Sequence, residues 1–312
     1  MENIIKKLKE KYCNTETISY FSFNVNFSDF VSFKTSGEVA VLFEPSNINQ
    51  LVEVLKFLKK EEIPFFIAGK GSNLFVTSKG YNGVVIRFIK HFNNLVFSKV
   101  DDKKTKVSCE CGVSLSNVGI KSFDLSLSGF ESLSLIPGTI GGAIYMNAGA
   151  YGIEIKDILS KVFILDYEKF ELLEISLENC DFGYRKSVFM DKPYIIISCE
   201  LILDKSDNKE DVLNKYKEFK EKRSSSQPLD KPSAGSTFKR PEGDFAGRLI
   251  EVSGLKGFSV GGAMVSNKHA GFVVNENNAT PEDVYNCINY IKKEVYDKTG
   301  VLLNEEVCIY GE

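Results

Sequence analysis

The sequence predicts an α+β protein with a domain boundary near residue 205. Three observations lead to this class. Residues 38–88 show a strand, a helix and further strands; a long glycine-rich segment, residues 137–152, lies between later strands; and near residue 205 the pattern changes to a charged helix followed by a Ser- and Pro-rich turn region. With 312 residues, 43% of them hydrophobic, the chain can bury a substantial core.

The N-terminal part is expected to begin with an amphipathic helix over residues 1–14. A strand over Val39–Phe43 follows, then a helix that Ser46 can cap and whose leucine and valine residues share one face. After this helix the apolar run at residues 64–69 predicts a buried strand. Further strands are expected at residues 84–88, 105–110, 161–165 and 194–203.

Beyond residue 205 the sequence predicts mainly helices. A charged helix comes first, and a short helix is expected around Phe245–Val252. A longer helix should begin at Thr280 and Pro281, because threonine caps and proline at the first turn are typical helix starts, and it should end at Gly300.

Composition excludes several classes of function. The net charge of −3, from 39 basic and 42 acidic residues, argues against an extended nucleic-acid surface. No apolar stretch is long enough to cross a bilayer, and the N-terminus lacks the apolar core of a secretion signal. The seven cysteines show no zinc-site spacing. We therefore expect a cytoplasmic, monomeric protein with reduced thiols, without a metal and without a membrane or nucleic-acid partner.

A first glycine-rich segment follows a predicted strand and reads AGKGSNLFV. Its glycines, Gly69 and Gly71, let successive backbone N–H groups face one anion, and Ser72 and Asn73 offer further hydrogen bonds. This arrangement suits a diphosphate. The third glycine of the dinucleotide fingerprint is missing and no phosphate-loop motif occurs, so an ordinary Rossmann site and a P-loop are both excluded.

The second glycine-rich segment, Pro137–Gly152, combines five glycines with small and apolar residues. Such a run permits close approach of the main chain to a large planar ligand, and its apolar residues indicate packing rather than a flexible linker. Flavin binding is the preferred interpretation. The candidate cofactor-binding residues here are Pro137, Gly138, Gly141, Gly142, Asn147 and Gly149.

Six motifs occur in one order along the chain: GKGSNL, IPGTIGGAIYMNAGAYG, CDFGYRKSVF, SAGSTFKRP, VSNKHAGFVVN and LNEEV. In this respect the chain resembles the UDP-N-acetylenolpyruvoylglucosamine reductase family, over about residues 33–311. The uninterrupted sequence after NAGAYG looks like the shorter, type II form of that family.

The resemblance implies a three-part architecture. Two α/β subdomains, residues 1–80 and 81–205, would form an FAD-binding fold similar to the vanillyl-alcohol oxidase type, and residues 206–312 an α+β substrate domain. It implies reduction of UDP-N-acetylglucosamine enolpyruvate to UDP-N-acetylmuramate, with NADPH as hydride donor and FAD as mediator, during peptidoglycan precursor synthesis. His91 has no family motif around it, so the FAD should be non-covalently bound.

The resemblance also assigns three catalytic residues. Arg185 would hold the substrate carboxylate, because a guanidinium can grip a carboxylate at two points. Ser236 would donate a proton to C2 from a buried, oriented hydroxyl; by spacing alone Ser233 would serve as well. Glu306 would orient or polarise the substrate, and Glu305 should face the other side.

A second carboxylate near the substrate carboxylate is repulsive when both are charged. Either Glu306 is protonated, the preferred alternative, or Arg185 lies between the two groups. The sequence departs from the common family pattern nearby, with Cys308 where an arginine often stands and Asn304 where a glutamate is usual.

The candidates for binding the nucleotide-sugar follow from the same motifs. They are Tyr184, Arg223, Gln227, Lys239, Arg240 and Asn267. Tyr184 could instead pack, and a structural hydrogen bond for His269 is as plausible as a ligand contact. Two other functions compete with the reductase: a related flavin oxidase that acts on an alcohol with oxygen as acceptor, and a flavin- or nucleotide-sugar-binding protein without catalysis.

Overall fold

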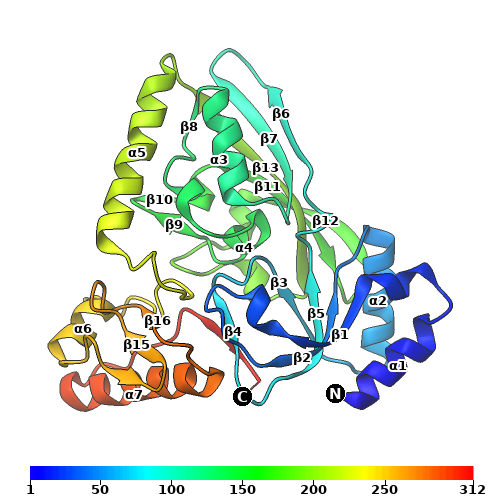
Figure 1. Ribbon diagram of the computed structural model, residues 1–312. Coiled ribbons are helices and arrows are strands. Elements are labelled where there is room, and N and C mark those ends of the chain that lie inside the picture. Colours follow the sequence, from blue (N-terminus) through cyan, green and yellow to red (C-terminus); the bar gives the residue numbers. More distant parts are fainter. Residues whose placement is uncertain (312) are drawn as a thin grey trace.

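The computed structural model describes residues 1–311, which form three larger sheets with helices packed against them (Figure 1). The first sheet has the strand order β1-β2-β5-β3. Its strands are β1 (Phe21–Asn26), β2 (Glu38–Phe43), β3 (Phe65–Ala68) and β5 (Tyr81–Arg87). The pair β1 and β2 is antiparallel, whereas β5 runs parallel to both β2 and β3.

The first sheet is buried on both faces. On one face Val84 and Ile86 of β5 pack in a core shared with helices α1 (Glu2–Tyr12) and α2 (Ile48–Lys60), whereas Val85 joins the core of the C-terminal part. This division follows from the alternation of side chains along a strand. Because β5 pairs on both sides within this sheet, the boundary predicted at residues 80/81 cuts through the sheet.

The predicted N-cap of α2 is wrong by one residue. Asn47 is the N-cap, and its side chain accepts a hydrogen bond from the backbone N–H of Gln50. Ser46 instead contacts the Gln50 side chain, since its backbone N–H donates to Oε1 over 2.7 Å. Serine and asparagine are comparable capping residues, so the local sequence does not decide between them.

The second sheet is antiparallel and has the order β12-β11-β13-β7-β6, with β8 beside β13. Its strands are β6 (Leu95–Lys99), β7 (Lys104–Glu110), β8 (Leu127–Ser128), β11 (Leu159–Asp166), β12 (Glu171–Ser176) and β13 (Tyr194–Lys205). Associated with this sheet are α3 (Leu115–Asp124), α4 (Ile140–Tyr145) and the short hairpin of β9 (Gly149–Ala150) and β10 (Ile153–Glu154) (Figure 1).

The C-terminal part begins with the long helix α5 (Lys209–Ser226). A small sheet then packs against two helices: α6 (Ala246–Val252), α7 (Pro281–Thr299), β14 (Ser259–Val260), β15 (Ala263–Val265) and β16 (Val273–Asn275). Helix α7 confirms its predicted ends, with Thr280 as N-cap and Gly300 as a left-handed C-cap. Short 3-10 helices lie at Glu16–Tyr20, Phe27–Phe30, Leu133–Leu135, Ile155–Asp157, Leu177–Cys180 and Val188–Met190.

The last strand returns the chain to its N-terminal part. Strand β17 (Cys308–Tyr310) pairs in parallel with β4 (Leu74–Val76), which directly follows the first glycine-rich segment (Figure 1). This pairing joins residues more than two hundred positions apart and places the segment before β17 beside that glycine-rich turn. None of the described helices is long and apolar enough to cross a membrane.

Candidate active site

A cavity of about 1090 Å³ is lined by segments from the N-terminal, middle and C-terminal parts of the chain. Its volume is at the upper end of the range of ligand pockets, about 300–1000 Å³, so that it suits a large ligand or two adjacent ligands. Both glycine-rich segments line this cavity. The lining includes the predicted cofactor-binding residues Gly69, Gly71, Ser72, Asn73, Pro137, Gly138, Gly141, Gly142 and Gly149.

The first glycine-rich turn is fixed by close packing. Gly71 has φ 67°, and a Cβ there would lie 2.0 Å from the carbonyl oxygen of Phe30. A Cβ on Gly69 would lie 2.6 Å from Oγ1 of Thr139, which caps the N-terminus of α4. The two glycine-rich segments are therefore in direct contact, and neither position accepts a side chain.

The second glycine-rich segment contains glycines of two kinds. A Cβ on Gly141 would lie 2.9 Å from Cβ of Cys111, so protein packing requires this glycine. A Cβ on Gly142 would meet no atom closer than Oγ1 of Thr139 at 3.6 Å, yet Gly142 lines the cavity. The packing of the chain leaves room for a side chain at Gly142, and the glycine keeps the cavity wall free of one. That pattern fits a bulky ligand lying against the main chain.

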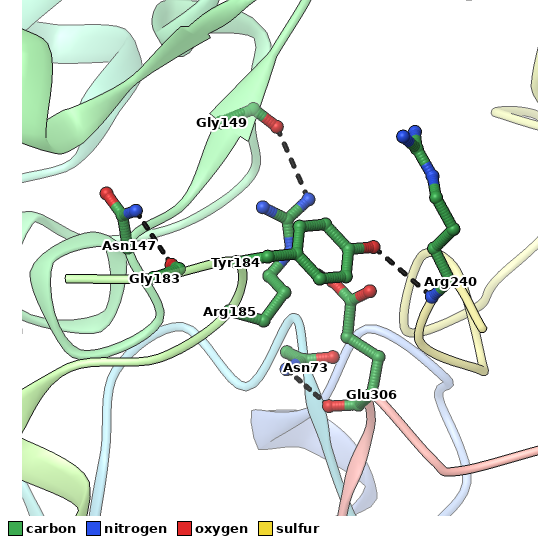
Figure 2. Close-up of polar contacts among 8 residues, drawn as sticks. All are labelled: Asn73, Asn147, Gly149, Gly183, Tyr184, Arg185, Arg240 and Glu306. Atoms are coloured by element: carbon green, nitrogen blue, oxygen red, sulfur yellow. Dashed lines mark hydrogen bonds and ion pairs between the residues drawn. The ribbon is translucent and has the colours of Figure 1, made fainter. Parts of the chain in front are cut away.

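Arg185 and Glu306 form an ion pair in the cavity (Figure 2). Arg185 Nε lies 2.7 Å from Glu306 Oε1, and the two side chains are only 18% and 14% exposed. The second nitrogen of the guanidinium, Nη2, donates to the carbonyl oxygen of Gly149 over 3.4 Å. Arg185 thus lies directly against Glu306, as the alternative in which Arg185 stands between Glu306 and the substrate carboxylate requires.

Ser236 is brought beside Glu306 by a backbone pairing. The N–H of Glu306 donates to the carbonyl of Thr237 over 2.9 Å, and the N–H of Lys239 donates to the carbonyl of Asn304 over 2.8 Å. Ser236 precedes this ladder and lines the cavity. Its side chain was predicted to be buried but is exposed, because it stands on the cavity wall.

Neighbouring residues fix the segment that carries Glu306. Asn73 Nδ2 donates to the carbonyl of Glu306 over 3.0 Å, and the carbonyl of Asn73 accepts from Cys308 N–H over 3.0 Å (Figure 2). Glu305 instead forms an ion pair with Lys292 of α7, so the two adjacent glutamates have different partners, as strand alternation predicts. Cys308 lines the cavity, and burial raises the pKa of its thiol.

Comparison with known proteins identifies the family. Residues 39–169 match the family described as "FAD binding domain", and residues 227–310 match "UDP-N-acetylenolpyruvoylglucosamine reductase, C-terminal domain". The chain is 46% identical over 281 residues to the UDP-N-acetylenolpyruvoylglucosamine reductase of Caldanaerobacter subterraneus subsp. tengcongensis, covering 90% of each chain. It is 44% identical over 282 residues to that of Clostridioides difficile, again covering 90% of each. The chain belongs to the UDP-N-acetylenolpyruvoylglucosamine reductase family.

A solved structure of the family has the same fold. The UDP-N-acetylenolpyruvylglucosamine reductase from Thermus caldophilus superposes with a TM-score of 0.77 at 30% identity, and the match covers 92% of this chain and 97% of that chain. The predicted α+β class, with an FAD-binding part and a C-terminal domain, is thereby confirmed.

Two further residues of this reductase-family chain point to a polar ligand. Arg223 and Gln227, near the C-terminal end of α5, line the cavity. Burial lowers the pKa of Arg223, and within residues 1–311 its side chain has no carboxylate partner. The Gln227 Oε1 atom is buried without a hydrogen-bond partner in the described chain. A partly buried cation without a carboxylate partner and a buried acceptor oxygen without a donor suit a polar ligand.

Four residues predicted to contact a ligand lie outside the cavity lining, namely Asn147, Tyr184, Lys239 and Asn267. The further candidate Arg240 lies outside it as well. The hydroxyl of Tyr184 accepts from the backbone N–H of Arg240 over 3.3 Å, and its ring centroid is 5.1 Å from the Arg185 guanidinium (Figure 2). Tyr184 is 48% exposed, and in the described chain it contacts Arg185 and Arg240 outside the cavity lining. Asn147 is fully buried behind the wall.

The sequence reasoning missed other cavity residues, among them Arg87, Tyr151 and Tyr310. Arg87 is the last residue of β5. The sequence feature that could have indicated it is a charged residue at the end of an apolar strand. Burial lowers the pKa of Arg87, and its Nε donates to the carbonyl of Gly69 over 3.3 Å. His269 does not line the cavity; its Nδ1 accepts from the N–H of Gly271 over 3.1 Å, a structural hydrogen bond.

Proposed function

We propose that this chain is an FAD-dependent, NADPH-consuming reductase that converts UDP-N-acetylglucosamine enolpyruvate to UDP-N-acetylmuramate in peptidoglycan precursor synthesis. One observation carries the proposal: Arg185, Glu306 and Ser236, from three distant segments, line the same cavity as both glycine-rich segments. The curated relatives that match over most of their length are named as reductases of this substrate.

The cavity residues fit FAD. Gly69, Gly71, Ser72 and Asn73 would hold its diphosphate through backbone N–H groups and side chains, and the segment around Gly142 would lie against the ring system. When bound, FAD accepts a hydride from NADPH and supplies it to C3 of the enol ether. His91 lies outside the cavity lining, and non-covalent binding is proposed.

The side chains of this chain would perform the remaining steps. Arg185 would bind the substrate carboxylate and stabilise the negative charge that develops there, while Glu306 orients the guanidinium through their ion pair. Ser236 would donate the proton to C2. Because a serine hydroxyl is a weak acid, this role requires a strongly basic enolate as acceptor and a fixed position of the hydroxyl.

The partly buried Arg223, together with Gln227, would contact the polar nucleotide-sugar. A guanidinium without a carboxylate partner is suited to a diphosphate. Lys239 and Asn267 would reach the substrate only if the loops that carry them approach it. The same proposal includes a type II chain, a monomeric state, a cytoplasmic location and a domain boundary at residues 205/206.

The test is anaerobic reduction of the purified yellow protein followed by addition of the enolpyruvyl nucleotide-sugar. NADPH should bleach the flavin, and the substrate should restore its colour with formation of UDP-N-acetylmuramate. If the substrate leaves the flavin reduced while oxygen and a simple alcohol support turnover, the chain is an oxidase. If neither NADPH nor NADH reduces a flavin that remains bound, it is a binding protein.

A further inference from the structure

Asn147 is a fully buried polar residue that does not belong to the cavity lining. Its Nδ2 donates to the carbonyl oxygen of Gly183 over 2.9 Å (Figure 2). The same atom donates to Oε2 of Glu154 over 3.0 Å, and the Asn147 Oδ1 accepts from the N–H of Lys156 over 3.3 Å. Both hydrogens of Nδ2 are therefore used inside the protein. A ligand contact by this amide would require breaking a buried hydrogen bond.

The carbonyl that Asn147 binds belongs to the turn that carries Arg185. Gly183 and Lys186 exchange two backbone hydrogen bonds, of 3.1 and 3.3 Å, and close a tight turn. Inside this turn Arg185 has φ 51°, a conformation that is uncommon for residues other than glycine. Such a conformation persists only where the surrounding structure fixes it.

The same two segments are joined a second time through Arg185 itself. Its Nη2 donates to the carbonyl of Gly149, two residues after Asn147, over 3.4 Å. Residues 147–149 thus contact this turn twice. The carbonyl of Gly149 accepts from the Arg185 guanidinium, and the Asn147 side chain donates to the carbonyl of Gly183. Loss of the Asn147 amide would release Gly183 and let the guanidinium move relative to Gly149 and Glu306.

We infer that Asn147 is a positioning residue for Arg185: it fixes the turn at residues 183–186 so that the guanidinium meets the substrate carboxylate. The inference rests on the proposed function. Because the substrate carboxylate takes part only in the reoxidation of reduced flavin, Asn147 should affect that half-reaction and leave reduction by NADPH unchanged. A cofactor-binding role would affect both.

The experiment compares Asn147→Ala with the matched control Ser187→Ala in the FAD-loaded full-length protein. Ser187 is also fully buried, and its Oγ donates to the carbonyl of Tyr145 over 2.6 Å, so it joins the same two segments without holding the Gly183 carbonyl. Anaerobic stopped-flow absorbance measures reduction by NADPH and reoxidation by the enolpyruvyl nucleotide-sugar separately. Bound FAD is quantified for each variant.

For Asn147→Ala we expect reoxidation to slow roughly 10- to 100-fold, the usual effect of a displaced catalytic group, with FAD content and the NADPH rate retained. Ser187→Ala should keep both rates near wild type, even if it lowers thermal stability. In an Arg185→Ala background, Asn147→Ala should have little further effect on reoxidation, because the group that it positions is gone.

Asn147→Asp provides a second variant, since it preserves the side-chain volume and the Oδ1 acceptor but loses both donors, the one to Gly183 and the one to Glu154, and places a carboxyl group beside that glutamate. It should show the same split between half-reactions. Equal slowing of both half-reactions, loss of FAD, additive effects with Arg185→Ala, or failure of both variants to fold would overturn the inference. If the wild type is itself not reoxidised by this substrate, the proposed function fails instead.

Discussion

Arg185, Ser236 and Glu306 reach the cavity by three different backbone features. Arg185 projects from a tight turn at positive φ, Ser236 precedes a short antiparallel ladder, and Glu306 lies two residues before the last strand. Only the identity of these residues could be predicted from the sequence, through family motifs. Their placement on one cavity could not, because it depends on the fold: Arg185 and Glu306, for example, are 121 positions apart in the sequence and form an ion pair in the structure.

The role of Ser236 gives a prediction at the level of one atom. Ser236→Ala should slow reoxidation of reduced flavin by the enolpyruvyl substrate by roughly two to four orders of magnitude, the usual contribution of a positioned general acid. Ser233→Ala is the control, because Ser233 also lines the cavity but is bridged to Val274 rather than placed beside Glu306. Anaerobic stopped-flow absorbance measures both. If Ser233→Ala slowed reoxidation more than Ser236→Ala, Ser233 rather than Ser236 would be the proton donor.

His269 predicts how stability depends on pH. Burial lowers its pKa from the usual value of 6.5, so below about pH 6.5 the unfolded chain binds more protons than the folded protein. The stability that neutral His269 contributes above about pH 6.5 is therefore lost as the pH falls from this value towards the lower pKa of His269 in the folded protein. His269→Asn keeps an acceptor for the Gly271 N–H but cannot be protonated.

Thermal unfolding at pH 7.5 and at pH 5.5 checks the sign. The melting temperature of the wild type should fall more between the two values than that of His269→Asn, with FAD content matched. The carboxylates of the two proteins are identical, so their contribution cancels in the comparison. Equal decreases in the melting temperatures of the two proteins would mean that His269 has the same pKa in the folded and unfolded states.

At the scale of elements, local signals predict α7 better than α2. Thr280 and Asp283 form a capping box, Pro281 follows the cap and Gly300 ends the helix, so each boundary is marked by a residue with one favoured position. In α2 two adjacent residues can cap, and the structure uses the second. Strand β17 had no comparable signal, because its partner β4 is supplied by the N-terminal part.

The adjacent glycines at the start of α4 give a paired prediction. Gly141→Ala should destabilise the protein by about 1–3 kcal/mol, the usual cost of overpacking, because the new Cβ would lie 2.9 Å from Cβ of Cys111. Gly142→Ala should leave the apoprotein as stable as wild type or raise its stability by up to about 1 kcal/mol, since alanine favours the helix. It should nevertheless weaken FAD binding.

Chemical denaturation of the two apoproteins and fluorescence titration with FAD separate these effects. Wild-type FAD affinity in Gly142→Ala would show that the cofactor does not approach the main chain there. Destabilisation of the Gly142→Ala apoprotein would show that this glycine serves packing instead. Both glycines appeared equivalent in the sequence, because the neighbours of each Cβ position are visible only in the fold.

At the scale of the whole molecule, the return of the C-terminal strand builds the site. The pairing of β17 with β4 places the backbone of Glu306 beside Asn73, so the residue proposed to act in catalysis is joined to the turn proposed to hold the cofactor. One face of the first sheet packs in a core with helices α1 and α2, and its opposite face packs in a second core with the C-terminal part. The predicted boundary at 80/81 missed this, since sequence pattern does not show which strands become neighbours.

The central claim is that one cavity brings the flavin, the enol ether and the three side chains together. A crystal structure of the oxidised, FAD-loaded protein with the enolpyruvyl nucleotide-sugar tests it most directly, because oxidised flavin cannot reduce the bound substrate. We predict Arg185 at the substrate carboxylate and Ser236 Oγ within hydrogen-bonding reach of C2, with the flavin ring beside C3. A substrate bound away from Ser236, or a flavin outside the two glycine-rich segments, would contradict the account.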